Sequence, residues 1–337
     1  MMNTKEIFMF AAIIFDLGES SNLTFTDIQV QYPFLFSDFS AHSTQCISWD
    51  ELHKSQDCSE LCFSDLPFLL HCKKQELLFV SSEIDHLYQA KAANVFSVGY
   101  SPDSSFLPTT YCFETFEDLG YSYFDHIFHR YNKSPITITE TPRLILRELS
   151  EQDLTSLFRI YQEPGLTTYM DEKNTDFEDF YGRMCSYISS VYSFFEYGMW
   201  GVFLKETGEL IGECGIQSDV LDGQEEIQIG YLLSTPYQKK GMAKEMIQAT
   251  LQYAHSTFSF QRIVAQILPN NTASIATAKS CHFRLEKRIK KADTAYYLYV
   301  WKPENSLPSK EHSVAQSVQE KLKDNTLSEV YKKCYKK

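Results

Sequence analysis

The chain has 337 residues, 43% of them hydrophobic, so it is long enough to form two globular domains with separate cores. Its formal net charge is −13, and most of that charge lies early: residues 1–134 hold 18 acidic against 7 basic side chains, whereas residues 135–337 hold 26 against 24. An acidic first half repels a polyanion, which excludes nucleic acid as its partner, and the change in composition predicts a domain boundary near residue 134.

The cysteines and the apolar N-terminal stretch indicate the compartment. The nine cysteines are odd in number, scattered through apolar contexts and without a CxxC pair, which is typical of reduced thiols in a reducing compartment. Their spacing matches no usual zinc pattern, so we expect no metal. The stretch "IFMFAAIIF" (7–15) is shorter than the roughly 20 residues that span a bilayer, and no A-x-A cleavage site follows it. We therefore expect a buried first strand, no membrane partner and a cytoplasmic location.

The second half alternates strand-like and helix-like segments. A proline- and threonine-bearing linker is predicted at 131–141, followed by an edge strand at 141–149 and a helix at 153–162 capped by Asp153. Residues 198–218 contain two apolar runs joined by the glycine-bearing turn "KETGE", which predicts an antiparallel hairpin.

The next segments predict the centre of a mixed α/β unit. Residues 225–233 alternate apolar and polar side chains, as in a strand with one buried face. The helix that follows should bury the apolar residues that recur at helical spacing, namely Met246, Ile247, Thr250, Leu251, Ala254 and Phe258. A strand (262–268), a helix (272–280) and a strand (295–301) complete this unit, and residues 304–337 are predicted to form a helical tail.

The segment "STPYQKKGMAKEMI" (234–247) joins that strand to that helix and has the features of an anion site. The first N–H groups of a helix have no partner within the helix and lie at the positive end of its dipole, so they bind phosphate. Gly241 lets the backbone approach such a ligand, and Lys239, Lys240 and Lys244 add positive charge. On these residues alone an ordinary exposed turn is an equally good interpretation. A Walker loop and a GxGxxG fingerprint are both absent.

At "QKKGMA" (238–243) the chain resembles the Gln/Arg-x-x-Gly-x-Gly/Ala loop of the GNAT superfamily of N-acetyltransferases, which binds the pyrophosphate of acetyl-CoA. The resemblance spans about 139–303 and is to the branch that contains the ribosomal-protein N-terminal acetyltransferases. It rests on that loop and on three further segments, "TPRLILRELSEQD", "LKETGELIGECGI" and "NNTASIATAKSCHF".

The resemblance implies a GNAT α+β domain at 135–303, with a mixed, mostly antiparallel, splayed sheet. It also implies an N-acetyltransferase with acetyl-CoA as co-substrate and a primary amine as acceptor, either a protein N-terminus or a small amine. The residues that it assigns to the cofactor are Leu232 and Leu233 along the acetyl-pantetheine arm, Gln238, Lys239, Lys240, Gly241, Met242 and Ala243 around the pyrophosphate, and Asn271 and Ser274 on the other side of the arm. For Asn271 and Ser274, a turn and a helix cap are equally good interpretations.

Three positions depart from the family pattern. His282 stands where the family has glycine, Gln228 where the strand commonly has glutamate, and Ala278 where many relatives have a tyrosine that acts as general acid. Glu226 is the candidate general base, with a solvated strand carboxylate as the alternative, and Glu213 is a second candidate. The incomplete acid and base set leaves a non-catalytic acyl-CoA-binding sensor or scaffold as the alternative function.

The first half resembles a different family. Residues 77–101 are predicted to form a strand, a helix and a strand, and residues 112–128 a short strand and a helix, which together resemble the closing part of haloacid-dehalogenase-like domains. The resemblance implies a Rossmann-like three-layer α/β domain at 1–134.

The acidic residues that such phosphatases require are largely missing from this half. Asp16 is present, but Gly18 stands at the position of the second aspartate, and Ser81 and Ser82 follow the later strand, leaving only Asp85. We expect a degenerate domain that binds or scaffolds, with a surviving phosphatase as the weaker alternative. The sequence specifies neither the acceptor nor the oligomeric state.

Overall fold

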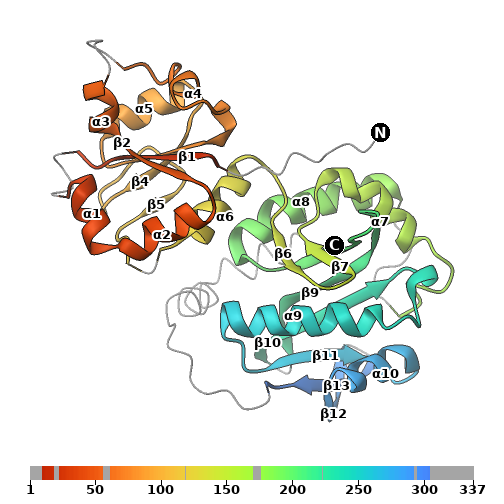
Figure 1. Cartoon of the computed structure of the whole chain (residues 1–337). Helices are drawn as coiled ribbons and strands as arrows, with labels where there is room; N and C mark the ends of the chain where they lie inside the picture. The colour runs from red at the N-terminus through yellow and green to blue at the C-terminus, as the bar shows by residue number, and fades with distance from the viewer. Residues whose placement is uncertain are drawn as a thin grey trace. The chain divides into compact units, whose positions relative to one another are not determined.

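The computed structural model describes residues 10–18, 23–55, 61–117, 119–169, 176–221, 223–291 and 294–303. The chain divides into two compact units, Met1–Ser134 and Pro135–Lys337 (Figure 1). Among the described residues, no helix is both long and apolar enough to cross a membrane. The predicted helical tail at 304–337 lies outside the described residues, as do residues 7–9 of the first apolar stretch.

The first unit is built on a five-stranded parallel sheet in the order β2-β1-β3-β4-β5. Its strands are β1 (Ala12–Asp16), β2 (Gln45–Ser48), β3 (Leu77–Ser81), β4 (Phe96–Tyr100) and β5 (Cys112–Phe113). The buried first strand is confirmed as β1, since all five of its residues are buried. The predicted strand, helix and strand at 77–101 are confirmed as β3, α5 (Ile84–Ala92) and β4.

Helices cover both faces of this sheet, so the unit has three layers. Ile13 and Phe15 point into a core shared with α1 (Phe25–Gln31), α2 (Pro33–Ala41) and α6 (Tyr121–Tyr131). Ala12 and Ile14 point to the opposite face, into a core shared with α3 (Trp49–Ser55), α4 (Leu66–Leu69) and α5. A short 3-10 turn, η2 (Lys74–Glu76), precedes β3.

The second unit contains an eight-stranded sheet in the order β12-β13-β11-β10-β9-β8-β7-β6. Neighbouring strands are antiparallel except for β10 and β11, which are parallel, so the predicted mixed and mostly antiparallel sheet is confirmed. The strands are β6 (Thr137–Glu140), β7 (Leu144–Arg147), β8 (Met199–Leu204), β9 (Leu210–Leu221), β10 (Gln224–Leu233), β11 (Ile263–Ile267), β12 (Arg284–Lys291) and β13 (Thr294–Trp301).

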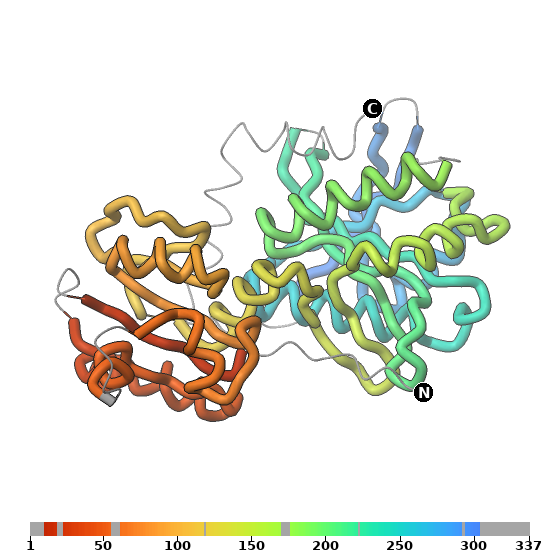
Figure 2. The backbone as a smooth tube through the Cα atoms, turned by 90° about the horizontal axis from the view of Figure 1, so that it is seen from above, coloured from red at the N-terminus to blue at the C-terminus, as the bar shows by residue number. Residues whose placement is uncertain are grey.

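The helices of this unit pack on the two faces of the sheet. They are α7 (Leu154–Tyr161), α8 (Phe177–Phe195), α9 (Met242–Phe258) and α10 (Thr272–Ser280), with the 3-10 turns η3 (Glu151–Asp153) and η4 (Thr235–Tyr237). Figure 2 shows the backbone from above. The buried side chains of α9 are the six that the helical spacing predicted, so that prediction is confirmed. Leu154, Leu157 and Phe180 from α7 and α8 pack against the other face of the sheet, beside Phe203.

One prediction about the start of this unit is wrong, and a second is confirmed only in part. Strand β7 is not an edge strand, because β6 pairs with it inside the segment that was predicted to be a linker. Alternating β-branched residues explain this strand, since Ile136 and Ile138 are buried on one face. Asp153 is the N-cap residue of α7, as predicted, but its side chain makes no cap hydrogen bond to that helix. It instead closes a capping box with Ser150 at the start of η3, and Arg147 pairs with it at 2.8 Å.

His282 occupies a left-handed backbone conformation, with φ +66°. It follows the C-cap of α10 in a Schellman motif, in which Phe283 N donates to Ala278 O and His282 N donates to Lys279 O. Phe283 and Ala278 are both buried, as the hydrophobic contact of that motif requires. The left-handed residue of the motif is usually glycine, because a Cβ raises the energy of this conformation by about 1–2 kcal/mol.

We expect His282→Gly to stabilise the second unit. The gain should be about 0.5–1 kcal/mol, because relief of the left-handed strain is partly offset by the greater freedom of glycine in the unfolded chain. Thermal unfolding should show an increase of about 2–4 °C in the corresponding Tm. Lys279→Gly, in the last turn of the same helix but not at a left-handed position, should lower the Tm; an unchanged or lower Tm for His282→Gly would contradict the assignment of strain to this residue.

Candidate active site

The loop between β10 and α9 has the backbone that the anion-site prediction requires. Lys239 and Gly241 are left-handed, with φ of +58° and +79°, and the chain turns through them into the first residue of the helix. No side chain caps α9, so the N–H groups of Met242, Ala243 and Lys244 have no acceptor within the helix. Gln238 is exposed, and its side-chain amide donates to Leu233 O at 2.8 Å.

The charge around this loop is positive. Lys239, Lys240 and Lys244 are all exposed, and within the described part of the chain none of them has a carboxylate in ion-pair range. The Lys240 ammonium lies 5.5 Å from the centre of the Tyr237 ring. An anion at the N-terminus of α9 would therefore meet lysines that no described acidic side chain neutralises.

Arg143 supports the loop and was missed by the sequence prediction. Its Nη1 donates to Lys240 O at 3.0 Å, and its Nε donates to Glu245 Oε2 at 2.7 Å. Glu245 lies in the first turn of α9 and also accepts from Thr141 Oγ1 at 2.6 Å. Burial by itself would raise the pKa of Glu245, but the hydrogen bonds from Thr141 and Arg143 and the charge of Arg143 hold it below its ordinary value. The signal in the sequence was a single arginine at the start of β7, about 100 residues from the loop.

Strand β10, which precedes the loop, separates from β11 beyond one position. β10 and β11 pair at Gln228 and Val264, and past that point no described residue of β11 is paired with β10. Leu232 and Leu233, predicted to line the acetyl-pantetheine arm, lie in the separated part of β10 but point to opposite faces. Leu233 is buried in the core beneath α9, and Leu232 packs against the α7 side. What this part of β10 offers along the gap is its backbone.

Asn271 and Ser274 lie at the start of α10, across the gap from β10. The Asn271 side chain accepts from Ser274 N at 3.1 Å, so it caps this helix, as the alternative interpretation held. Tyr231 on β10 reaches the same turn, where its hydroxyl donates to Ser274 O at 3.0 Å. Tyr231 therefore ties the two sides of the gap together, and burial raises the pKa of its phenol, which keeps it protonated near neutral pH.

Glu226, the candidate base, is held in an ion pair. Arg262 donates to both of its carboxylate oxygens at 3.0–3.1 Å and to Glu286 at 2.8–2.9 Å. The Glu226 side chain is 11% exposed. It lies before Gln228, opposite Asp219 of β9, about 13 Å along the strand from Gly230. To accept a proton from an amine, Glu226 would have to leave Arg262.

Glu213 is closer to the gap. It lies opposite Leu232 in the β9–β10 ladder, is 2% exposed and accepts from Tyr161 Oη at 2.6 Å. The two buried thiols of this unit are poor nucleophiles, because burial raises the pKa of Cys214 to about 12 and also raises that of Cys281. The arrangement is therefore suited to direct attack by an acceptor rather than to a cysteine-bound intermediate.

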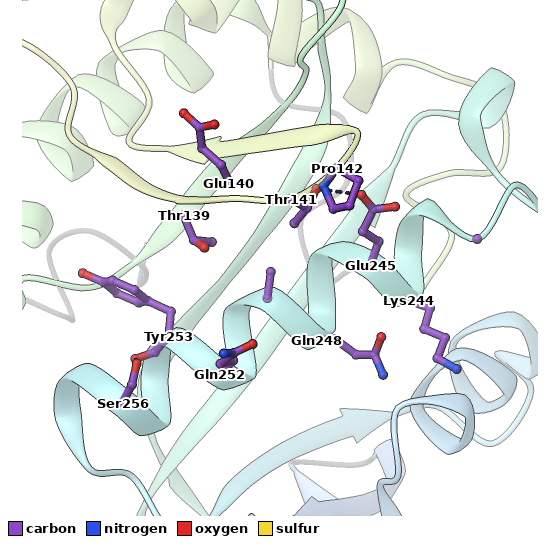
Figure 3. Close-up of a pocket in the computed structure, with 12 residues that line it drawn as sticks. Thr139, Glu140, Thr141, Pro142, Lys244, Glu245, Gln248, Gln252, Tyr253 and Ser256 are labelled. Atoms are coloured by element: carbon purple, nitrogen blue, oxygen red, sulfur yellow. Dashed lines mark hydrogen bonds between the residues drawn. The ribbon is translucent and has the colours of Figure 1, made fainter.

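A groove of about 650 Å³ runs along the outer flank of α9, opposite the β6–β7 turn. Figure 3 shows its lining, in which Gln248, Gln252 and Tyr253 from α9 lie across from Thr139 and Glu140. The groove meets the cofactor loop at Gly241 and Lys244, but it contains none of the candidate acid or base residues. It adjoins the anion site and is separate from the gap between β10 and β11.

The helix N-terminus without a side-chain cap, the left-handed loop before it and the separated parallel strands beside it have the features expected of a site for a phosphorylated ligand. A family profile described as acetyltransferase (GNAT) domain matches residues 143–284. The uncharacterized N-acetyltransferase p20 of Bacillus licheniformis is 31% identical over 158 residues, which are 46% of this chain and 86% of that protein. The chain belongs to the GNAT acetyltransferase family.

Two further proteins illustrate the similarity. The uncharacterized N-acetyltransferase YoaA of Bacillus subtilis strain 168 is 28% identical over 137 residues, 41% of this chain and 77% of its own length. A solved acetyltransferase from Agrobacterium tumefaciens strain C58 is 25% identical, covers 49% of this chain and 94% of its own, and has a TM-score of 0.43. As a member of the family the chain is an acyltransferase, and its co-substrate is acetyl-CoA.

Arg143→Ala should weaken acetyl-CoA binding about tenfold. The variant releases the loop carbonyl of Lys240 and leaves the Glu245 carboxylate without its arginine partner beside the predicted phosphate site. The free energy of unfolding should change by less than about 1 kcal/mol, because Arg143 is 46% exposed and such pairs are screened. Calorimetric titration gives the Kd.

Lys205→Ala is the matched control, since it breaks the exposed ion pair with Glu140 on the same edge of the sheet and does not touch the loop. If both variants bind acetyl-CoA like the unmodified chain, Arg143 does not organise the cofactor loop.

Proposed function

We propose that the second unit transfers the acetyl group of acetyl-CoA to the nitrogen of a primary amine, on a protein N-terminus or a small molecule. The observation that carries the proposal is the set of open N–H groups at Met242, Ala243 and Lys244, reached through two left-handed residues and surrounded by exposed lysines. Backbone N–H groups in this arrangement match the oxygens of a pyrophosphate. Gln238, Lys239, Lys240 and Gly241 complete the proposed cradle.

The arm of the cofactor would lie in the gap between β10 and β11. Backbone groups of β10 that face the gap have no described β11 partner past Gln228, and they match the amide groups of the pantetheine arm. Asn271 and Ser274 would border the arm on the other side, at the turn that Tyr231 contacts. A backbone N–H directed at the thioester carbonyl would stabilise the oxyanion that forms during attack.

The acceptor that suits this site is an amine of low pKa. Deprotonating a lysine-type amine of pKa about 10.4 costs roughly 4.6 kcal/mol at pH 7, whereas an α-amino group of pKa 7.7–8.0 costs about 1–1.4 kcal/mol. Glu226 remains the predicted base, and in this role it would act only after its ion pair with Arg262 opens. An α-amino group needs the least help from such a base.

Gly241→Glu should abolish micromolar binding of acetyl-CoA in a calorimetric titration. The substitution places a side chain and a negative charge on a left-handed residue that borders the proposed pyrophosphate site. Gly223→Glu is the matched control, because Gly223 also has a positive φ, +78°, and open space around it, and it lies at the opposite end of β10.

Three results separate the alternatives. Binding that is lost only in Gly241→Glu, together with thiol release when amines are added, supports the acetyltransferase. Binding without thiol release from any of a broad set of amines supports the acyl-CoA sensor or scaffold instead. Failure of the unmodified chain to bind acetyl-CoA would refute both.

We propose further that the first unit is a degenerate haloacid-dehalogenase-like domain without phosphatase activity. Its parallel sheet places Asp16 and Ser81 at the carboxyl ends of β1 and β3, where ligands of such sheets bind. The Asp16 carboxylate is 5% exposed and accepts from Ser81 Oγ at 2.6 Å, while His86 Nδ1 lies 2.8 Å away. A Cβ on Gly18 would lie 1.8 Å from Glu83 Oε1, so Glu83 fills the space of the second aspartate.

These residues do not fit the magnesium ion on which such phosphatases depend. Asp16 already has two side-chain partners, and burial, opposed by those partners, raises its pKa. Throughout the described ranges, no three His, Cys, Asp or Glu side chains are grouped so that they could hold a metal ion. The site lacks the ligand set for metal-assisted phosphoryl transfer.

The full chain should therefore release no phosphate from p-nitrophenyl phosphate when magnesium chloride is added. Asp16→Asn provides the control, because any activity that survives in this variant comes from a contaminant. Magnesium-dependent release that Asp16→Asn abolishes would revive the phosphatase.

A further inference from the structure

Three polar side chains form a hydrogen-bonded row across the centre of the acetyltransferase sheet. Asp219 on β9, Gln228 on β10 and Gln266 on β11 share one face of the sheet, the face opposite α9. Gln266 Nε2 donates to Asp219 Oδ2 at 2.9 Å and also to Gln228 Oε1. Gln228 is the position where β10 and β11 pair, so this row of side chains lies at the point where the gap opens.

The Asp219 carboxylate, at one end of this row, fixes the orientation of both glutamine amides. An ionised carboxylate only accepts hydrogen bonds, so Gln266 must turn its NH2 group toward Asp219. That NH2 group then requires an acceptor from its second partner, so Gln228 must present its oxygen. Asp219 is itself held in place, because its Oδ1 accepts from Val220 N at 2.8 Å and Lys291 Nζ lies 3.1 Å from Oδ2.

This orientation leaves one donor and one acceptor available. The Gln228 NH2 group and the Gln266 carbonyl have no partner among the described residues, and neither is a fully buried atom. Gln228 lies two residues, about 7 Å, from Gly230 in the separated part of β10. A donor and an acceptor side by side match the C=O and N–H groups of a peptide bond.

We propose that Gln228 and Gln266 recognise a peptide group beside the acceptor amine, which makes the acceptor the N-terminus of a peptide or protein. The inference rests on the proposed acetyltransferase function and narrows its substrate class. A glutamate at position 228 would present a second acceptor where this chain presents a donor. In this chain residue 228 positions the acceptor and does not take its proton.

The test compares two acceptors of similar amine pKa. One is an equimolar set of tripeptides that carry every N-terminal residue followed by Gly-Gly, and the other is a fluorinated alkylamine that has no carbonyl group. Thiol release from acetyl-CoA gives kcat/KM for each. The unmodified full chain should prefer the tripeptides at least tenfold, because an acceptor without a peptide group leaves the two amides unpaired.

Gln228→Glu should lower the ratio of kcat/KM for the tripeptides to kcat/KM for the alkylamine at least tenfold and leave the Kd for acetyl-CoA unchanged. Gln224→Glu introduces the same charge on the same face of β10, at an exposed position far from the gap, and should change neither rate. Asp219→Asn frees Gln266 to turn its amide, so it should raise KM for the tripeptides several-fold with little change in kcat.

Equal use of both acceptors by the unmodified chain, or an equal loss of both rates in Gln228→Glu, would overturn the inference while acetyl-CoA binding and turnover kept the proposed function intact. Failure to acetylate the tripeptides in a chain that binds acetyl-CoA would also overturn it. Absence of acetyl-CoA binding would show that the proposed function itself fails, and the inference with it.

Discussion

The second unit depends on how little β10 and β11 pair. They are the only parallel neighbours described in an otherwise antiparallel sheet, and their ladder consists of Gln228 and Val264. Parallel strands need a crossover, and here that crossover is α9, which packs its apolar face on the sheet. The helix therefore begins where β10 ends, so one topological feature creates both the gap with unpaired backbone groups and the open helix N-terminus beside it. A ligand with amide groups at one end and phosphates at the other matches both.

The contacts around the loop stabilise it without neutralising it. Glu163 accepts from Ser234 Oγ at 2.5 Å and from Thr235 N at 2.7 Å, which fixes the entry to the loop, and Arg143 fixes its exit. Three carboxylates that contact the loop, Glu163, Glu209 and Glu245, are thus already engaged by donors. The lysines keep their charge available, since no described acidic side chain pairs with them. Although the chain is acidic overall, this loop therefore places lysine charge where the helix N-terminus is also positive, which suits an anionic ligand.

Sequence periodicity predicted the parts of this fold whose burial is strongly patterned. The six buried residues of α9 repeat at helical spacing, and the glycine at 208 sits in the turn between two apolar strands. The strand β12 (Arg284–Lys291) was missed because Ile289 is its one buried residue, so its exposed charged side chains hide the alternation. The helix α8 was missed because its aromatic residues are not distinctive of a helix. These two elements are determined by pairing with β13 and by packing against α7, which are long-range contacts that no local pattern contains.

In the candidate site, too, local features were predictable from the sequence and long-range contacts were not. The cofactor loop follows from a strand, two small residues and a helix in sequence, all local features. The environment of Glu226 does not, because its partner Arg262 lies just before β11, and Glu286, which also binds Arg262, lies on β12. The role of Arg143 was not predictable for the same reason. It is distant from Gly241 in sequence, but its Nη2 lies 3.6 Å from the position that a Cβ added to Gly241 would take.

The ion pair of Glu226 and the amide at Gln228 together constrain the chemistry. The Glu226 carboxylate would have to leave Arg262 before it could take a proton, and an amide accepts no proton near neutral pH, so these two side chains of the proposed acceptor site supply little basicity. An acceptor whose amine is mostly protonated at pH 7 would then react only through its rare neutral form. An α-amino group of pKa 7.7–8.0 is neutral in roughly 10–15% of molecules at pH 7, whereas a lysine-type amine is neutral in about 0.04%. The difference of more than two orders of magnitude favours an α-amino acceptor before any contact with the site is counted, and the peptide-shaped pair of amides favours the same one.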